Sequence, residues 1–534
     1  MSTFTMPTQA MIKPDLEALL DEVLERHQNP EDRHEIAAIL ESLGWNDIRA
    51  RETFGVEDVF GLADVLWERC SSKVMYTSFS KVERLNLRDM TMLLIRQFLR
   101  GVIFAIPMAI SVASMLTLKY SLWSYENLSV ELATSIAIGT ILSFITVGGF
   151  TQAIARRGFF YIIQGYYNMA RRITFHFIKL GFLLCLLICV AIILLNLVIK
   201  VFPIDMLVVI ILYFFFLNTI WLSVTVMYIL KKELLFTGLI IVGIVVVFLL
   251  FSVMNLNIIV AQLIALSLVS IVSMLMVVHL FKQAELKEEK GISPELPKMS
   301  VTLFSTLPYY VYGTLYFTFL FIDRIVAWTR NSDFMPYLIW FRGEYELGLD
   351  FALLVLILPM GISEVVLTKM MMDIEISQKS YWGDEVHIMN RKFLSVYVHR
   401  LLQILLAAVI SAVLLYWSLI QLFEHFPSLS TKSLFASPET YLVFIVSLIA
   451  YVIVAVALMN AVILFSLSQP DFVVRSIWIS LLVNIGSGFL LSRWIDYHYA
   501  VFGLLLGSIV FLYFTTKHVI KVLRNLDYYL YAAS

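Results

Sequence analysis

Long apolar segments separated by short polar connections dominate the chain from residue 101 onward. A helix needs about 20 mostly apolar residues to cross the hydrocarbon core of a bilayer. Twelve such segments are present, at 101–122, 130–153, 174–201, 204–230, 234–254, 257–281, 301–328, 348–370, 394–422, 440–467, 472–493 and 499–520. A membrane-spanning β-strand would alternate in polarity and end after about ten residues, so the pattern predicts α-helices. Only Lys200 and Pro203 separate the third segment from the fourth, which leaves the count open at that point.

A polar stretch at 282–300 divides these segments into two sets of six. It separates a first half at 101–281 from a second half at 301–522. Because each half has an even number of spans, both halves have the same orientation, and a twofold relation between them would run along the membrane normal. The sequence therefore predicts an all-α integral membrane protein with about 12 transmembrane helices in two six-helix pseudo-repeats.

Matching proline and glycine positions support the repeat. The first span of each half contains a proline about seven residues from its start, Pro107 in one half and Pro308 in the other. The second span of each half ends at a glycine-containing step, at 147–149 and at 359–361, and the latter begins with Pro359. Proline bends a helix because it lacks a backbone N–H, so we predict hinges at all three prolines. Paired interrupted helices indicate a transport path between the halves; the alternative is coincidence, since proline is common in membrane helices.

The residues outside the spans are polar and divide into three parts. Apolar residues at helical spacing within 1–75 predict a small cytoplasmic helical domain that acts in docking or assembly. The basic stretch 76–100 predicts an amphipathic helix on an anionic membrane surface, and 523–534 is expected to be a cytoplasmic tail. No cleavable signal sequence is recognisable before the first span, which favours a cytoplasmic amino terminus.

The distribution of Lys and Arg predicts the orientation. Counted from a cytoplasmic amino terminus, the inner connections carry fourteen of these residues and the outer connections carry six. Basic residues are retained on the cytoplasmic side, so we expect both termini in the cytoplasm of a multi-pass protein of a bacterial inner membrane.

Composition supports the membrane assignment. Of 534 residues, 60% are hydrophobic and 15% are charged, with a mean hydropathy of +0.85, whereas a soluble domain has about a quarter charged residues. The net charge of −1 argues against nucleic acid as a partner. The three cysteines do not form a disulfide framework, and Cys185 and Cys189 are expected to be small buried side chains. No metal site or cofactor is expected.

Ionisable residues at membrane depth are the candidate functional residues, because burying charge in a bilayer is costly. They are Asp323, Arg324, Glu346, Asp350, Glu364, Arg400 and Arg475. We expect them to line a hydrophilic path for a polar substrate. The alternative is that they form interhelical ion pairs or lie at headgroup depth.

The eighth span carries three of these acids. Glu346, Asp350 and Glu364 are spaced so that, in a regular α-helix, all three lie on one face and extend about 21 Å along the axis. Arg324 lies near the end of the preceding span and is expected to pair with Glu346 or Asp350. Such an acidic line would suit a cationic polymer rich in amino sugars.

Several function classes are excluded by what the sequence lacks. It contains no P-loop, HExxH or GxSxG motif and no DxD-type pair for a nucleotide sugar, so we expect no catalytic residues. The first half is nearly free of deep charge, and its first span has no acid after Arg100. That absence argues weakly against a proton-coupled drug antiporter, in which acids deep in this helix would be expected.

The chain resembles the multidrug/oligosaccharidyl-lipid/polysaccharide (MOP) exporter superfamily over residues 90–534. Within it, GEYELGLDFALLVLILPMGISEVVLTKMMMDIE at 343–375 and LDYYLYAAS at 526–534 resemble the Pel exopolysaccharide transporter branch. The resemblance implies bent first and seventh helices, a central cavity that opens alternately to each side, and a glycan polymer or sugar-lipid as substrate. It also implies a cytoplasmic glycosyltransferase and other membrane subunits as partners.

Taken together, these features favour a non-enzymatic exporter of a polysaccharide or sugar-lipid, working by alternating access or within a synthase complex. A multidrug or lipid-linked-oligosaccharide flippase is the nearest alternative. A non-transporting membrane scaffold that recruits a glycan synthase is a second alternative. A membrane-embedded glycosyltransferase is a third, disfavoured by the short outer loops.

Overall fold

The computed structural model describes most of the chain in two compact units, Met1–Asn86 and Leu87–Ser534. The described residues are 16–26, 32–76, 87–286, 297–330, 338–378, 386–426, 435 and 437–531. Among them the regular elements are helices, and the one β-type pairing is an isolated bridge between Tyr120 and Tyr125. The predicted all-α class is confirmed.

The first unit contains four short helices. They are α1 (Leu16–Arg26), α2 (Arg33–Ser42), α3 (Asp47–Phe54) and α4 (Val59–Tyr76). Side-chain caps begin two of them: Asn46 accepts from the backbone N–H of Arg49 at 2.9 Å, and Asp32 accepts from the N–H of Glu35 at 2.9 Å. The N–H of Glu35 also lowers the pKa of the Asp32 carboxyl, because the hydrogen bond favours its charged form. The unit has a core of its own.

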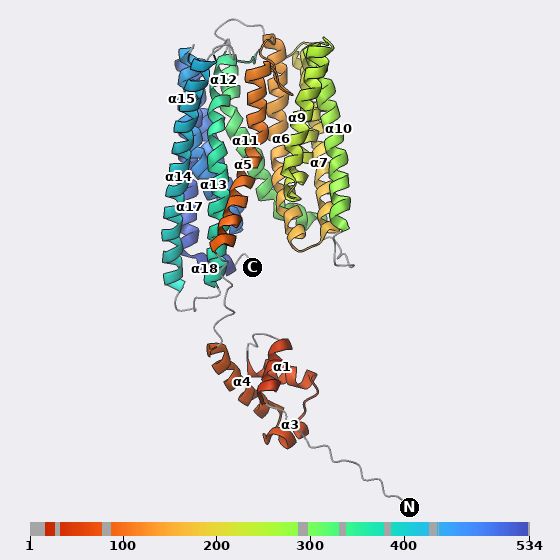
Figure 1. The fold of residues 1–534 in the computed structure, drawn as a ribbon, viewed down its shortest axis with the longest axis vertical. Helices are drawn as coiled ribbons and strands as arrows, with labels where there is room; N and C mark the ends of the chain where they lie inside the picture. Colours follow the sequence, from red (N-terminus) through yellow and green to blue (C-terminus); the bar gives the residue numbers. More distant parts are fainter. Residues whose placement is uncertain are drawn as a thin grey trace, which may run out of the picture. The chain divides into compact units, whose positions relative to one another are not determined.

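The second unit is a bundle of long helices (Figure 1). They are α5 (Leu87–Leu118), α6 (Val130–Ile163), α7 (Tyr167–Ile199), α8 (Ile204–Ile229), α9 (Glu233–Phe248), α10 (Ile258–Glu285), α11 (Met299–Trp328), α12 (Gly343–Leu353), α13 (Ile357–Gln378), α14 (Val386–His425), α15 (Pro438–Ser466), α16 (Pro470–Trp494), α17 (Val501–Arg524) and α18 (Leu526–Tyr531). In the described residues, eleven stretches are long and apolar enough to cross a membrane, and bent α5 makes a twelfth. Each corresponds to one predicted segment, with α12 and α13 sharing the eighth.

The uncertain third and fourth spans are two separate helices. α7 ends at a left-handed Lys200 (φ 52°), and Pro203 precedes the first turn of α8. Cys185 and Cys189 are buried against Phe214 of α8, as predicted.

Some helices extend beyond the predicted spans. α6 continues to Ile163 and α13 to Gln378, beyond the predicted span ends at residues 153 and 370. Residues 87–100, expected on the membrane surface, are the first turns of α5, and the Phe98 ring packs against Gly361 of α13. In the expected tail, Leu526 is fully buried and Asn390 donates to Asp527 at 3.1 Å.

The packing of the second unit repeats between its halves. Two hydrophobic clusters lie mostly within α6–α10, and a third lies mostly within α11–α17. The first helix of each half packs most extensively against the second span of the other half: α5 against α13, and α11 against α6. Figure 1 shows the start of α5 beside α13, among the helices of the second half. An exchange of first helices is the packing that a twofold relation between the halves would produce.

Two prolines interrupt helices at the predicted positions. α5 bends by 45° between Ile103 and Ala105, where Pro107 cannot donate a hydrogen bond to the carbonyl of Ile103. Pro359 likewise leaves the Val355 carbonyl without a helix donor, and the Ser411 hydroxyl of α14 donates to it at 2.7 Å. A 3₁₀ turn, Leu354–Leu356, lies just before that point. Pro308 lies within α11, which remains one helix of 30 residues.

Candidate functional site

Glycines allow the two halves to approach closely where their helices cross. A Cβ added to Gly313 of α11 would lie 2.1 Å from the carbonyl oxygen of Gly148 in α6. In the related crossing, a Cβ on Gly101 of α5 would lie 2.7 Å from the Cα of Gly361 in α13. Gly148 and Gly361 belong to the two glycine-containing steps noticed in the sequence. These steps are therefore the places where the first helix of the opposite half packs against the second span.

A cluster of four ionisable side chains, the charge cluster, lies between α11 and α12. It consists of Asp323, Arg324, Glu346 and Asp350. Arg324 pairs with both Glu346 and Asp350, the latter at 3.0 Å between Nη1 and Oδ1. The predicted pairing of Arg324 is confirmed.

Aromatic donors complete the charge cluster. The Trp328 indole N–H donates to Glu346 Oε1 at 3.0 Å, and the Tyr345 hydroxyl donates to Asp323 Oδ2 at 2.8 Å. Asp323 is fully buried, whereas the Asp350 side chain is 56% exposed. One guanidinium thus faces three carboxyl groups, and Asp350 is the most exposed member of the cluster.

A row of half-buried aromatic rings, the aromatic row, adjoins the charge cluster and joins the two halves. Phe144 of α6 stacks on Trp221 of α8 at 4.6 Å between centroids, and on Phe317 and Phe321 of α11 at 5.5 and 5.4 Å. The Arg324 guanidinium lies 5.3 Å from the centre of the Phe321 ring. The aromatic row and Asp350 therefore meet through Arg324.

Glu364, the third acid of the predicted line, is separated from Glu346 and Asp350 by a 3₁₀ turn between α12 and α13. Glu364 lies within electrostatic range of Arg100 and Glu233, which pair with each other at 2.9 Å. The expectation of one acidic face along the eighth span stays a prediction.

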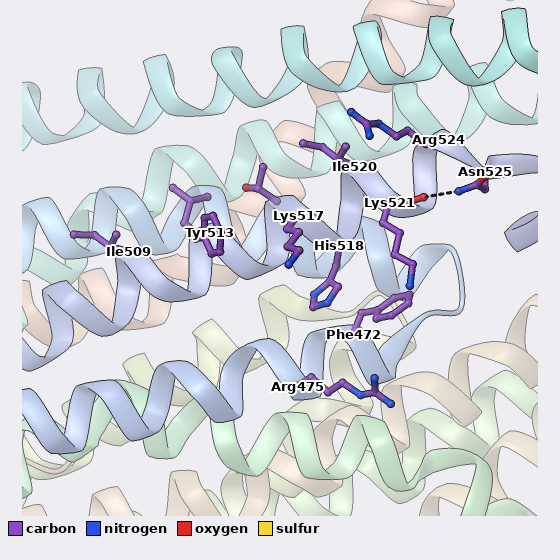
Figure 2. Close-up of a pocket in the computed structure, with 12 residues that line it drawn as sticks. Phe472, Arg475, Ile509, Tyr513, Lys517, His518, Ile520, Lys521, Arg524 and Asn525 are labelled. Atoms are coloured by element: carbon purple, nitrogen blue, oxygen red, sulfur yellow. Dashed lines mark hydrogen bonds between the residues drawn. The ribbon is translucent and has the colours of Figure 1, made fainter.

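The two remaining candidates lie elsewhere. Arg400 of α14 donates to Gln403, one turn further along the same helix, at 2.9 Å. Arg475 of α16 lines a pocket between α16 and α17 (Figure 2). Neither residue is among the described contacts of the charge cluster. That any of the seven candidates lines a substrate path stays a prediction.

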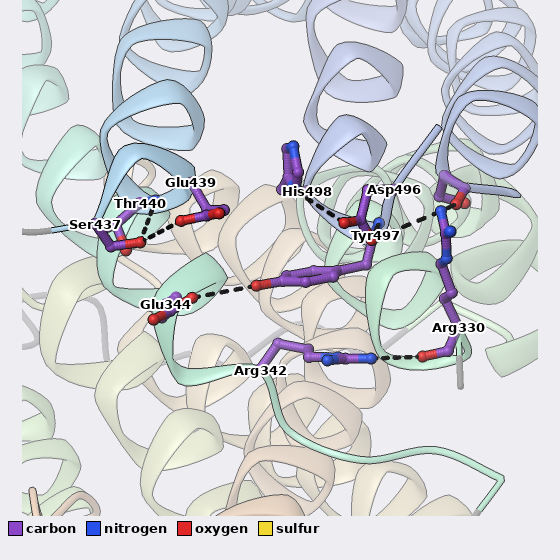
Figure 3. A network of polar contacts seen from close by, with 10 residues as sticks. Arg330, Arg342, Glu344, Ser437, Glu439, Thr440, Asp496, Tyr497 and His498 are labelled. Carbon is purple, nitrogen blue, oxygen red and sulfur yellow. Dashed lines mark hydrogen bonds and ion pairs between the residues drawn. The ribbon is translucent and has the colours of Figure 1, made fainter. Parts of the chain in front are cut away.

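A polar network lies at the end of the bundle opposite to Leu87 and Arg524, which we call the far end (Figure 3). Arg342 is placed between two rings, 3.6 Å from the Trp340 centroid and 4.3 Å from the Tyr497 centroid. It donates to the carbonyl of Arg330 at 2.8 Å, and Tyr497 donates to Glu344 at 3.2 Å. Next to Arg342, the backbone N–H of Phe341 donates to Thr134 of α6 at 2.9 Å. This bond joins the second half to the first at the far end.

The arrangement of the second unit is that of a known group of transporters. No protein-family model matches the sequence, and no curated protein matches it. Among solved structures, a point mutant of the Vibrio cholerae MATE transporter VcmN superposes with a TM-score of 0.56 at 14% identity, over 82% of this chain and 98% of that one. The chain has the MATE transporter fold. The eukaryotic MATE transporter AtDTX14 gives 0.52 at 13% identity, over 83% and 98% of the two chains, and the bent form of VcmN gives 0.52 at 15%, over 82% and 99%.

At 13% to 15% identity this likeness shows the fold, and the superfamily resemblance and its Pel-like branch stay predictions. Together with the long apolar helices, the transporter fold supports a multi-pass membrane protein. The aromatic row and the far-end network were missed by sequence reasoning. Phe144 and Trp221 lie in apolar spans, and no motif in the sequence around them marks them as functional. Their contact with α11 depends on how the two halves pack. The α16–α17 pocket did have a signal, because Lys517, Lys521 and Arg524 share one helical face.

Proposed function

We propose that the chain is a membrane transporter that exports a polysaccharide or sugar-lipid along the boundary between its halves. The observation that carries this proposal is the junction of the aromatic row with Asp350. The row contributes stacked rings from both halves, and Asp350 contributes an accessible carboxylate at membrane depth.

These two features match the two kinds of surface on a sugar. Aromatic rings offer apolar faces that pack against the C–H face of a pyranose ring. A carboxylate accepts hydrogen bonds from hydroxyl groups. The excess of carboxyl groups over guanidinium in the charge cluster further favours a cationic glycan, such as one rich in amino sugars.

A multidrug transporter is the second candidate, and the MATE fold favours it, because the superposed solved structures are MATE transporters. Aromatic rings also bind planar drugs. Against it, α5 carries no acid after Asp89, so an acid for proton coupling would have to be supplied by another helix. We prefer a glycan as the substrate because the exposed acid, Asp350, lies beside the aromatic row. It does not lie in the first helix, where an acid for proton coupling would be expected.

Two assays, each in its own host, separate these functions. We would delete the gene in its source organism, restore it on a plasmid, and measure surface and secreted glycan. In parallel, we would express it in a drug-sensitive host and measure the inhibitory concentrations of cationic drugs. Loss of glycan on deletion, with recovery on complementation and no change in drug resistance, supports the proposal. A rise in drug resistance with unchanged glycan would replace it with the multidrug function.

The proposed exporter would receive its glycan from a cytoplasmic glycosyltransferase. The first unit, with its independent four-helix core, is the candidate docking module for such a partner. Co-purification of the enzyme with the full chain, and its loss when residues 1–75 are removed, would support that assignment.

A further inference from the structure

A pocket of about 1060 Å³ lies between the start of α16 and the end of α17. Its lining includes Arg475, Lys517, His518, Lys521 and Arg524, and contains no carboxylate. Figure 2 shows Lys517, His518 and Lys521 of α17 extending toward α16, where Phe472 and Arg475 lie. In the described part of the chain, no carboxylate forms an ion pair with Arg475, Lys517, Lys521 or Arg524. The pocket therefore gathers positive charge without a counter-charge from the protein.

Two ordinary explanations account for part of this charge. Basic residues collect at the cytoplasmic ends of membrane helices, and cations near a helix carboxyl end interact favourably with its dipole. The dipole applies to Lys521 and Arg524, in the last turn of α17. It does not apply to Arg475, which lies near the amino end of α16. Neither explanation requires these residues to share one concave surface.

Contacts among the side chains hold the basic part of the pocket in place. The Phe472 and His518 rings stack at 4.8 Å between centroids, and Lys521 Nζ lies 5.0 Å from the centre of the same Phe472 ring. His518 Nδ1 is 3.0 Å from the Ser476 hydroxyl. An anion entering the pocket would find Lys521 already positioned against Phe472.

The other part of the pocket is apolar and accessible. Ile509 and Tyr513 are 47% and 61% exposed, and they line the pocket farther from the end of α17 than Lys517 does. From Ile509 to Arg524 the helix extends about 22 Å, at 1.5 Å per residue. A free phosphate would use only the basic part, whereas an anionic lipid would place its headgroup among the cations and an acyl chain along Ile509 and Tyr513.

We propose that the α16–α17 pocket binds an anionic phospholipid, with its phosphate held by Arg475, Lys517 and Lys521. The site is distinct from the charge cluster and does not depend on the nature of the exported substrate. Bound lipid would supply the missing counter-charge at this end of the second half.

The test uses the full chain purified in a neutral detergent, titrated with short-chain phosphatidylglycerol, phosphatidylcholine or inorganic phosphate. Binding is followed by native mass spectrometry and by the shift in thermal unfolding. The variant combines Arg475→Gln, Lys517→Gln and Lys521→Gln. The matched control combines Lys231→Gln, Lys232→Gln and Lys282→Gln, three exposed lysines of the first half near the ends of α8 and α10.

We expect the unaltered chain to prefer phosphatidylglycerol, the pocket variant to bind it at least about tenfold more weakly, and the control to change less than about twofold. Equal binding by the pocket variant and the unaltered chain would overturn the proposal. So would equal affinity of the unaltered chain for phosphatidylcholine, a result that does not depend on how the variants fold. A phosphate-induced shift as large as that from phosphatidylglycerol, at the same concentration, would assign the pocket to a free anion instead.

Discussion

Arg324 is the residue on which the charge cluster depends, because its buried guanidinium pairs with both Glu346 and Asp350. Arg324→Ala would leave the buried Glu346 without its ion-pair partner, and breaking a buried pair on one side costs about 3–5 kcal/mol. We expect a clear fall in the unfolding temperature of the purified protein. The triple variant Arg324→Ala, Glu346→Gln, Asp350→Asn removes the charges together and should recover part of that loss. A triple variant less stable than Arg324→Ala alone would contradict this view of the cluster.

Asp32 gives a residue-scale test of the first unit. Its carboxylate caps α2, and its pKa in the folded chain is lowered. Stability from this cap is therefore fully present above the unfolded pKa of about 3.9 and is lost as the pH falls through the lower folded value. Hydrogen exchange on the full chain should show the amides of His34 and Glu35 losing protection over that pH range. Asp32→Asn keeps a capping oxygen without a charge, so in this variant the protection of the same two amides should be independent of pH. If the variant lost protection over the same pH range as the unaltered chain, the Asp32 cap would be ruled out as the cause.

How far these residues were predictable depends on how local their contacts are. The pairing of Arg324 with Glu346 and Asp350 followed from two consecutive spans that meet at one end. The charged neighbours of Glu364 did not follow, because Arg100 and Glu233 belong to α5 and α9, far from Glu364 in the sequence. The role proposed for Phe144 and Trp221 depends on the contact of Phe144 with a third helix, α11. Nothing in the spans of these two residues predicts that contact.

At the scale of elements, the close crossings of α11 with α6 and of α5 with α13 require glycine. Gly313→Leu would bring side-chain atoms into the Gly148 backbone, and overpacking of this kind costs about 1–3 kcal/mol or more. We expect lower stability and loss of export. Gly486→Leu on α16 is the matched control, because nothing lies within 4 Å of a Cβ added there. The measurements are thermal unfolding in detergent and glycan export at equal protein level; equal effects of the two substitutions would mean that the crossing is not tightly packed.

The elements themselves were largely visible in the sequence, because a bilayer demands long apolar runs with few exceptions. All twelve predicted segments have a counterpart. The ends of the helices were less predictable from the sequence. α6 and α13 extend beyond their apolar stretches, and residues 87–100 belong to α5. The proline in α5 predicted its bend, whereas the proline in α11 left a single helix, so proline alone does not fix the geometry.

At the scale of the whole molecule, the account requires the halves to separate at the far end during export. The backbone of Phe341 bonds to Thr134 there, which places the two halves in contact. In a chain with Cys70, Cys185 and Cys189 replaced by alanine, we would introduce Thr134→Cys and Phe341→Cys and bridge them with a short bifunctional methanethiosulfonate, which joins the two thiols through reducible disulfide bonds. Export should stop on crosslinking and return on reduction. The single-cysteine variants are the controls, and continued export by the fully crosslinked protein would favour a scaffold that does not move substrate.

Export by cells carrying Asp350→Asn tests the central claim most directly, with Asp205→Asn, an exposed acid at the start of α8, as the matched control. Membrane protein levels are measured alongside secreted glycan. The account predicts that Asp350→Asn lowers secretion at least about tenfold at an unchanged protein level, as expected when a charge-assisted contact of about 1.5–3 kcal/mol is removed, while Asp205→Asn secretes normally. Normal secretion by Asp350→Asn would contradict it, because the accessible carboxylate beside the aromatic row would then have no part in the path.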